Sequence, residues 1–309
     1  MISNFILLIL GLVLLIFGGD YLVKSAVSFA RKLNVSPFLI GITVVSFGTS
    51  APELMVSIQA ALENASGIAL GNVVGSNIAN IGLVLGLTVI LKPINVEKRK
   101  YFFSWFVMIF SSLLLIILIS DSNISFIDGI IFSLCLLGFI LSSIKYLKND
   151  EIVEGVEEEK SLPITFFYFL IGCLGLYFGS EFFVNNAVVI AKFLGVSEFI
   201  IGITIIAFGT SLPELVTCIV ASLKNQNSIS IGNLIGSNIF NILAVLGITA
   251  LVEPLYFSEM NFSSTLSLST MLVFALFLGA LLLNKKISRL KGLILLAGYI
   301  IYILLSLII

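Results

Sequence analysis

Long apolar runs, separated by short polar breaks, follow one another along the whole chain. Each run is close to the roughly 20 residues that an α-helix needs to cross a hydrocarbon core about 30 Å thick. We place ten such segments, at residues 4–23, 38–61, 67–91, 102–120, 125–146, 163–183, 198–222, 228–251, 263–283 and 292–309. The pattern predicts an all-α polytopic membrane protein with ten transmembrane helices.

The composition supports the same class of protein. Of the 309 residues, 59% are hydrophobic and 11% are charged, and the mean hydropathy is +1.19, whereas soluble domains carry about 25% charged residues. The first run, at residues 5–23, has no basic flank before it and no small-residue cleavage site after it. We therefore interpret it as a retained helix rather than a signal peptide.

Two residue types narrow the possible chemistry. The chain contains no histidine, which excludes a Ser-His catalytic pair, an HExxH zinc site and a His-ligated haem. The three cysteines, Cys135, Cys173 and Cys218, lie singly inside apolar runs without the spacing of a metal site. We expect them to act as small buried hydrophobic residues.

A shift of 161 residues places two parts of the chain in register. GITVVSFGTSAPEL at 41–54 falls on GITIIAFGTSLPEL at 202–215, and GNVVGSNIANI at 71–81 falls on GNLIGSNIFNI at 232–242. Of the 55 positions in 34–88, 31 are identical to their counterparts in 195–249. Because Gly, Pro, Asn and Glu stay in register, we infer a duplication. It divides the chain into a first five-helix repeat (1–147), an acidic linker (148–161) and a second five-helix repeat (162–309).

An odd number of spans in each repeat predicts that the two repeats have opposite orientations in the membrane, an inverted arrangement typical of transporters. The basic residues indicate the same orientation, since fifteen of the sixteen Lys and Arg fall at the end of spans 1, 3, 5, 7 and 9 or in the linkers after them, with Lys192 as the exception. The positive-inside rule then places those linkers, including 148–161, in the cytoplasm and both termini outside. We expect a multi-pass protein of the cell (plasma or inner) membrane.

Two acidic residues stand out because each lies well inside a predicted span. Glu53 and Glu214 correspond to each other under the 161-residue shift. A lone charge at the centre of a bilayer costs at least about 2.5 kcal/mol, so two symmetric carboxylates predict an ion-binding function. A structural alternative is that Ser50 with Glu53, and Ser211 with Glu214, form capping boxes where a broken helix restarts.

Other hard oxygen donors accompany the two glutamates. Ser50 and Ser211 precede them by three residues and share their helical face. Prolines at 52 and 213 leave backbone carbonyls near Gly48 and Gly209 without helical partners. Polar stripes follow in the next spans, at Asn72, Ser76 and Asn80 and at Asn233, Ser237 and Asn241; their alternative role is to hold helices together.

This set of oxygens favours calcium or sodium over zinc or copper. Two carboxylates neutralise one calcium ion or two sodium ions, so the two kinds of ion would compete for the same charges. Magnesium fits less well because it requires a stricter octahedron.

These motifs resemble the two alpha-repeats of the sodium/calcium exchanger family. The resemblance covers both repeats and implies alternate binding of calcium and sodium between spans 2, 3, 7 and 8, with Glu53 and Glu214 as central ligands. It also implies three sodium ions per calcium ion, and spans 1 and 6 that slide past the other eight. The further positions that it implies are the backbone carbonyls of Ser46, Thr49, Ala207 and Thr210, the side chains of Ser50, Ser76, Ser211 and Ser237, and Asn80 and Asn241 in the middle of the cluster.

Two departures from the family pattern carry information. Some members, including potassium-dependent ones, have Asp where this chain has Asn241, which argues against potassium coupling. Position 46 is Ser, whereas its counterpart is Ala207. The short central linker also leaves no room for a large cytoplasmic calcium-sensing insert.

Three alternatives to a sodium/calcium exchanger remain open. A proton-coupled calcium or cation antiporter of the same superfamily is the nearest, although such proteins tend to carry Gly-Asn-Ala-x-Glu at the GTSxPE position. A cation channel and an intramembrane enzyme are the others. We expect a transporter that is not an enzyme and needs no cofactor. Its partners would be Ca²⁺, Na⁺ and the lipid bilayer, without nucleic acid or an obligate protein partner.

Overall fold

The computed structural model describes residues 2–147, 161–195, 209–257 and 262–308. The first half contains α1 (Ile2–Lys32), α2 (Pro37–Ile40), η1 (Gly41–Val45), α3 (Ser46–Thr49), α4 (Ala51–Leu62), α5 (Ser66–Ala79), η2 (Asn80–Leu85), α6 (Gly86–Leu91), β1 (Ile94–Asn95), α7 (Lys98–Leu118), η3 (Ile119–Asp121), β2 (Asn123–Ile124) and α8 (Phe126–Leu147). The second half contains α9 (Leu162–Phe193), α12 (Leu212–Leu223), α13 (Asn227–Phe240), η5 (Asn241–Leu246), α14 (Gly247–Val252), β3 (Leu255–Tyr256), α15 (Phe262–Leu282), β4 (Lys286–Ile287) and α16 (Arg289–Ile308).

The duplication is visible in the order and bounds of the elements. Helices α4 and α5 and segments η2 and α6 recur 161 residues later as α12, α13, η5 and α14, with the same lengths. Left-handed backbone recurs as well, since Asn64 (φ 59°) corresponds to Asn225 (φ 62°), and Asn34 (φ 53°) corresponds to Gly195 (φ 78°). Strand β1 pairs with β4, and β2 pairs with β3, so each short antiparallel pair joins one half to the other.

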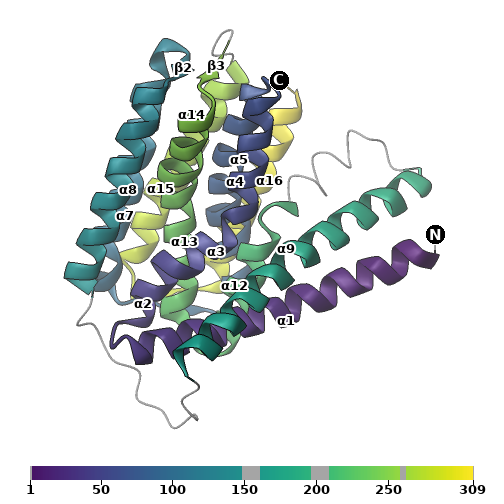
Figure 1. Cartoon of the computed structure of the whole chain (residues 1–309), viewed down its shortest axis with the longest axis vertical. Coiled ribbons are helices and arrows are strands. Elements are labelled where there is room, and N and C mark those ends of the chain that lie inside the picture. Colours follow the sequence, from purple (N-terminus) through teal and green to yellow (C-terminus); the bar gives the residue numbers. More distant parts are fainter. Residues whose placement is uncertain (1, 148–160, 196–208, 258–261, 309) are drawn as a thin grey trace.

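Helices α1 and α9 form a long pair that extends away from the rest of the bundle (Figure 1). They run antiparallel, because Gly11 of α1 faces Gly179 of α9, whereas Gly18 further along α1 faces the earlier Gly172. The approach is close enough that a Cβ added at Gly18 would lie 2.7 Å from the backbone nitrogen of Leu176. Small residues at such crossings let helices pack backbone to backbone in a membrane.

Eight helices of the described residues are long and apolar enough to cross a membrane. The second predicted span corresponds to a bent pair, residues Pro37–Thr49 and Ala51–Leu62, which meet at 43°. The seventh predicted span, 198–222, lies partly outside the described residues, and its described part is α12. Two predicted spans were too short, because α1 and α9 continue past residues 23 and 183 to Lys32 and Phe193. The hydrophobic run marks only the apolar part of each helix. Helix α1 continues without a break through basic residues such as Lys24 and Lys32.

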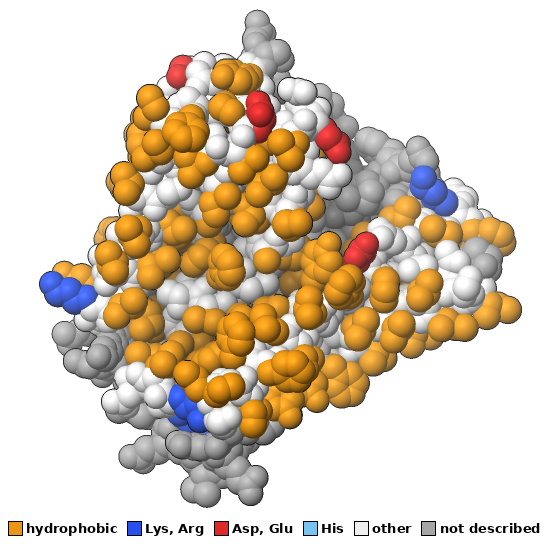
Figure 2. Space-filling view, viewed as in Figure 1, with side chains coloured by type: hydrophobic (Ala, Val, Ile, Leu, Met, Phe, Trp, Pro, Cys, Tyr) orange, Lys and Arg blue, Asp and Glu red, His pale blue; other side chains and the backbone are white. Residues whose placement is uncertain are grey.

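The outer surface is apolar. Orange side chains cover most of the face shown in Figure 2, and the few charged side chains lie mostly toward its edges. Large residues such as Leu134, Ile127 and Ile117 are 63%, 66% and 65% exposed, respectively. So large an exposed apolar surface fits a lipid environment, and the chain is a multi-pass membrane protein.

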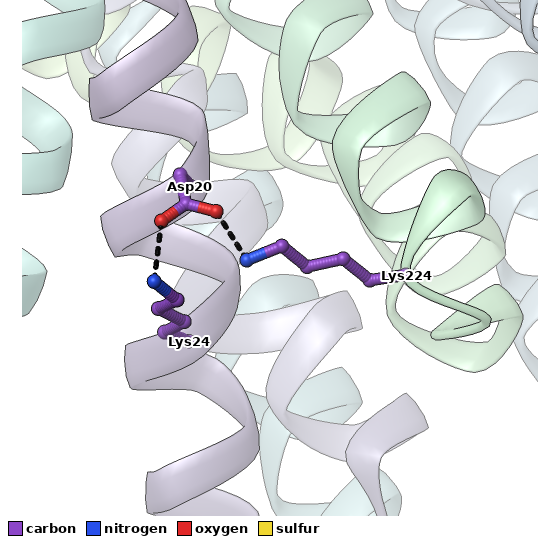
Figure 3. Close-up of polar contacts among 3 residues, drawn as sticks. All are labelled: Asp20, Lys24 and Lys224. Carbon is purple, nitrogen blue, oxygen red and sulfur yellow. Dashed lines mark ion pairs between the residues drawn. The ribbon is translucent and has the colours of Figure 1, made fainter.

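One ion-pair cluster joins α1 to α12 (Figure 3). Asp20 of α1 pairs with Lys24, four residues further along the same helix, at 2.8 Å between Oδ2 and Nζ. Its other carboxylate oxygen pairs with Lys224, which directly follows α12. Only the second of these pairs links two separate helices.

Candidate ion-binding site

The helix that carries Glu53 is broken just before that residue. Helix α3 ends at Thr49 and α4 begins at Ala51, with Ser50 between them at φ −89° and ψ 4°. Ser211 has nearly the same angles, −88° and 5°, immediately before α12. The break lies where the Gly and Pro residues of the GTSxPE motif predicted it.

Neither serine caps the helix that follows it. The side chains of Ser50 and Ser211 make no capping hydrogen bond within the described residues, so the capping-box alternative is wrong. The Ser50 hydroxyl donates instead to Oε1 of Glu214 in the other half, at 3.4 Å. Near the second break, the Gly209 carbonyl accepts from the Ser180 hydroxyl of α9 at 2.8 Å, so this carbonyl is open to a partner outside its own helix.

The two carboxylates are fully buried, each with 0% of its surface exposed. Both oxygens of Glu53 and Oε2 of Glu214 accept no hydrogen bond within the described part of the chain, and no described Lys or Arg pairs with either residue. The two charges are close enough to repel each other. Buried anions without partners are strongly destabilising, so the two carboxylates require compensation, either by bound cations or by protons.

Neutral oxygens of the same kind surround the carboxylates. The Ser76 side chain lies beside Glu53, and the side chains of Thr49 and Ser237 lie beside Glu214. Several further buried oxygens have no hydrogen-bond partner among the described residues: Ser76 Oγ, Asn80 Oδ1, Ser211 Oγ, Thr217 Oγ1 and Asn241 Oδ1. Native cores satisfy most buried polar atoms, so these unsatisfied oxygens are candidates for ligand binding.

Segments of π-helix position part of this set. Segment η2 begins at Asn80, η5 begins at Asn241, and η1 ends directly before Ser46. A π-helical turn holds an extra residue, which changes the direction of the side chains that follow, and such turns are frequent at functional sites. The hydrophobic pattern of the sequence contains no signal for these turns.

The structure brings most of the predicted residues together and gives some of them a supporting role. Asn72 donates through Nδ2 to the Glu53 backbone carbonyl at 3.1 Å, and Asn233 Oδ1 accepts from the Thr49 hydroxyl at 3.0 Å. The Ser46 hydroxyl donates to the Asn233 carbonyl at 3.1 Å. These bonds hold one segment to another, which is the alternative role of the polar stripes. Ala207 lies outside the described residues.

Two residues near the site were not predicted. Thr217 is fully buried with an unpartnered hydroxyl, and it replaces Val56 of the first repeat. Asn77 is 1% exposed and bonds to the second repeat. The sequence did contain a signal for Asn77, because it is repeated in register as Asn238.

A cavity of about 420 Å³ adjoins the site. Its lining includes Asn72 and Ser76 of α5, Thr210 at the second break, and Tyr299 and Tyr302 of α16. Ile68, which is 62% exposed, also lines the cavity. The cavity therefore borders both an exposed residue and residues of the polar cluster.

The fold and the site define a mainly helical, polytopic membrane protein with a buried cluster of hard oxygen atoms. Comparison with known proteins identifies it more closely: the chain belongs to the family described as sodium/calcium exchanger protein, which matches residues 3–145 and 164–308. This confirms the resemblance found in the GTSxPE and GNxxGSN motifs. Several relatives of the chain are described as exchangers or antiporters.

Full-length relatives show the same membership. The chain is similar to the putative antiporter CaxA of Alkalimonas amylolytica (38% identity, 96% of each chain). It is also similar to the sodium/calcium exchanger MaX1 of Methanosarcina acetivorans (33% identity, 97% of each chain). The structure of the sodium/calcium exchanger from Methanococcus jannaschii aligns with a TM-score of 0.83 at 34% identity, over 98% of each chain.

Proposed function

We propose that this protein is a secondary active antiporter that exchanges Na⁺ for Ca²⁺ by alternating access. The observation that carries the proposal is the pair Glu53 and Glu214, fully buried, related by the duplication and without basic partners in the described part of the chain. Two such charges balance one calcium ion or two sodium ions, so occupation by one ion species would exclude the other.

In this proposal the ions are bound by oxygens from both repeats. Glu53 and Glu214 are the central ligands. The remaining donors are the carbonyls of Ser46, Thr49, Ala207 and Thr210, the hydroxyls of Ser50, Ser76, Ser211 and Ser237, and the amides of Asn80 and Asn241. The unpartnered oxygens of Ser76, Ser211 and Asn241 support this assignment, and the adjoining cavity offers a route for ions.

The proposed arrangement in the membrane has ten spans in two inverted repeats, at 1–147 and 162–309. The antiparallel α1 and α9 and the exchanged strand pairs β1–β4 and β2–β3 support it. With the basic linkers in the cytoplasm, both termini would lie outside the cell membrane and residues 148–161 inside it. Sodium and calcium are then the transported substrates rather than resident cofactors.

Uptake of radioactive calcium into sodium-loaded proteoliposomes tests this function. Dilution into sodium-free buffer should drive uptake, and dilution into buffer with equal sodium should not. Uptake that ignores sodium but follows a pH gradient would instead assign the protein to the proton-coupled antiporters of the superfamily.

A further inference from the structure

Asn77 and Asn241 form a short hydrogen-bonded chain beside the carboxylates. Asn77 Nδ2 donates to the backbone carbonyl of Asn238 at 3.2 Å and lies 3.6 Å from Met271 Sδ. Asn241 Nδ2 in turn donates to Asn77 Oδ1 at 3.1 Å. Asn77, Asn238 and Asn241 are 1%, 2% and 0% exposed, respectively, so water does not compete for these bonds.

The direction of this chain follows from its first acceptor. A backbone carbonyl and a thioether sulfur can only accept hydrogen bonds, so the Asn77 amide must turn its NH₂ group toward Asn238 and Met271. Its Oδ1 then faces Asn241 and can only accept, which forces Asn241 to present its own NH₂ group. If the Asn241 amide turned over, two carbonyl oxygens would face each other across 3.1 Å.

The consequence concerns the other end of the Asn241 amide. Its Oδ1 is buried and has no partner among the described residues. Asn241 lies one turn beyond Ser237, whose side chain lies beside Glu214, and Asn77 directly follows Ser76, which lies beside Glu53. The free oxygen is therefore held within the polar cluster, where a carbonyl oxygen suits a hard cation and an NH₂ group repels one.

The first repeat lacks the corresponding chain. Asn238, the counterpart of Asn77, donates to the Leu234 carbonyl of its own helix at 2.7 Å. Asn80, the counterpart of Asn241, has no partner for either Nδ2 or Oδ1 within the described structure. The hydrogen bonds thus fix the orientation of one amide of the pair and leave the other unconstrained.

We propose that Asn77 is a positioning residue for cation binding, which fixes Asn241 so that its carbonyl oxygen faces the ions. This proposal rests on the proposed function, because it takes the cluster to be the ion site. Asn241 then offers the cation a neutral carbonyl oxygen in a fixed orientation and adds no further negative charge to the site. Residues that orient metal ligands in this way typically change metal affinity by about 10–100-fold when mutated.

Calcium binding to the purified full-length protein, measured by isothermal titration calorimetry in detergent, tests the proposal. Asn77→Ala should raise the dissociation constant for calcium about tenfold, at the lower end of that range because one ligand among several is affected. The matched control is Asn238→Ala, which also removes a buried amide, and it should stay within about twofold of wild type. Equal losses in the two variants would overturn the proposal, since they would indicate general damage to the core.

A double-mutant cycle separates positioning from packing. In an Asn241→Ala background there is no amide left to orient, so adding Asn77→Ala should have little further effect on calcium affinity. If the two losses simply add, Asn77 does not act through Asn241. Should Asn77→Ala fail to fold, Asn77→Ser provides the same test, because its short hydroxyl can bond back to its own helix.

The same titrations distinguish this proposal from the proposed function. Calcium binding by wild type that is lost in Glu53→Gln but unchanged in Asn77→Ala would reject the positioning role alone. Calcium binding that is unchanged in Glu53→Gln would reject the site itself.

Discussion

The two halves of the polar cluster share most of their oxygen-bearing residues but differ in what holds them. Glu214 accepts a hydrogen bond from Ser50, whereas both carboxylate oxygens of Glu53 are without one in the described structure. The Gly209 carbonyl accepts from Ser180 of α9, while the position corresponding to Ser180 in α1 is Gly19, which has no hydroxyl.

The same contrast extends to the ion pair between α1 and α12. Asp20 of α1 pairs with Lys224 (Figure 3), but the counterparts of these two residues are Glu181 and Glu63, two acids that cannot form such an ion pair. The duplication therefore preserved most of the residues that we propose to bind ions and changed several that brace the elements around them. Two symmetric half-sites of this kind need not be equal in energy, and each difference offers a way to test its importance.

The largest effect is expected where the halves are alike. Glu53→Gln or Glu214→Gln removes one of two negative charges from a buried site. We expect calcium exchange in proteoliposomes to fall at least about 100-fold, because losing a charged ligand should cost more than losing a residue that only orients a ligand. The controls are Glu63→Gln and Glu181→Gln, at exposed positions, which should exchange calcium like wild type. Wild-type activity in Glu53→Gln or Glu214→Gln would contradict the assignment of these carboxylates to the ion site.

An intermediate effect is expected at Ser50. Its hydroxyl bonds to Glu214, whereas the Ser211 hydroxyl bonds to no described group. A bond of this kind contributes about 1 kcal/mol, so Ser50→Ala should raise the sodium concentration for half-maximal exchange about fivefold, and Ser211→Ala should raise it less. Sodium titrations of calcium efflux provide the measurement, and an unchanged response in Ser50→Ala would show that this hydroxyl does not contact sodium.

A smaller effect is expected at the ion pair between α1 and α12. Partly exposed pairs contribute about 0.2–1 kcal/mol, so Lys224→Gln should change the ratio of apparent calcium affinities on the two faces of the membrane by at most about fivefold. Right-side-out and inside-out vesicles give the two affinities. Lys24→Gln is the matched control, because Lys24 pairs with Asp20 inside one helix; an equal shift in both variants would show that the link between helices is unimportant.

The smallest effect is expected at Cys218. It is fully buried, donates to the Ser230 carbonyl, and takes the place that Ser57 has in the first repeat. Because Asn72 donates to Ser57 as Asn233 does to Cys218, Cys218→Ser should retain these contacts. We expect calcium exchange within about twofold of wild type, since the hydrogen bond that changes contributes about 1 kcal/mol or less, and a complete loss would assign the thiol a role that Ser57 does not have.

The sequence predicted the class of protein from residue type, and the duplication that it indicated recurs in the bounds of the elements. The role of Glu53 and Glu214 as ion ligands stays a prediction. The broken helix before Glu53 followed from its Gly and Pro neighbours, and the membrane character followed from the apolar runs. The predicted ends of the two spans that correspond to α1 and α9 were wrong, because a helix can continue beyond its hydrophobic part.

Other features could not be predicted because they depend on three-dimensional contacts. The π-helical turns at Asn80 and Asn241 shift backbone hydrogen bonds without changing the hydrophobic pattern. Strands β1 to β4 have two residues each, too few for any alternation. Two hydrogen bonds depend on which segments of the two halves meet. One joins Asn77 to Asn241, and the other joins Ser50 to Glu214 instead of to the end of its own helix.

Anomalous X-ray scattering from strontium-soaked crystals locates the bound ion directly, because strontium is a heavy substitute for calcium. We expect an anomalous peak between Glu53 and Glu214, with oxygens of both carboxylates within about 2.6 Å of the ion, the upper range for calcium-type ligands. The peak should be absent from crystals of Glu53→Gln. A well-ordered wild-type structure with strontium bound elsewhere, or with neither carboxylate near the ion, would show that Glu53 and Glu214 do not form the ion site.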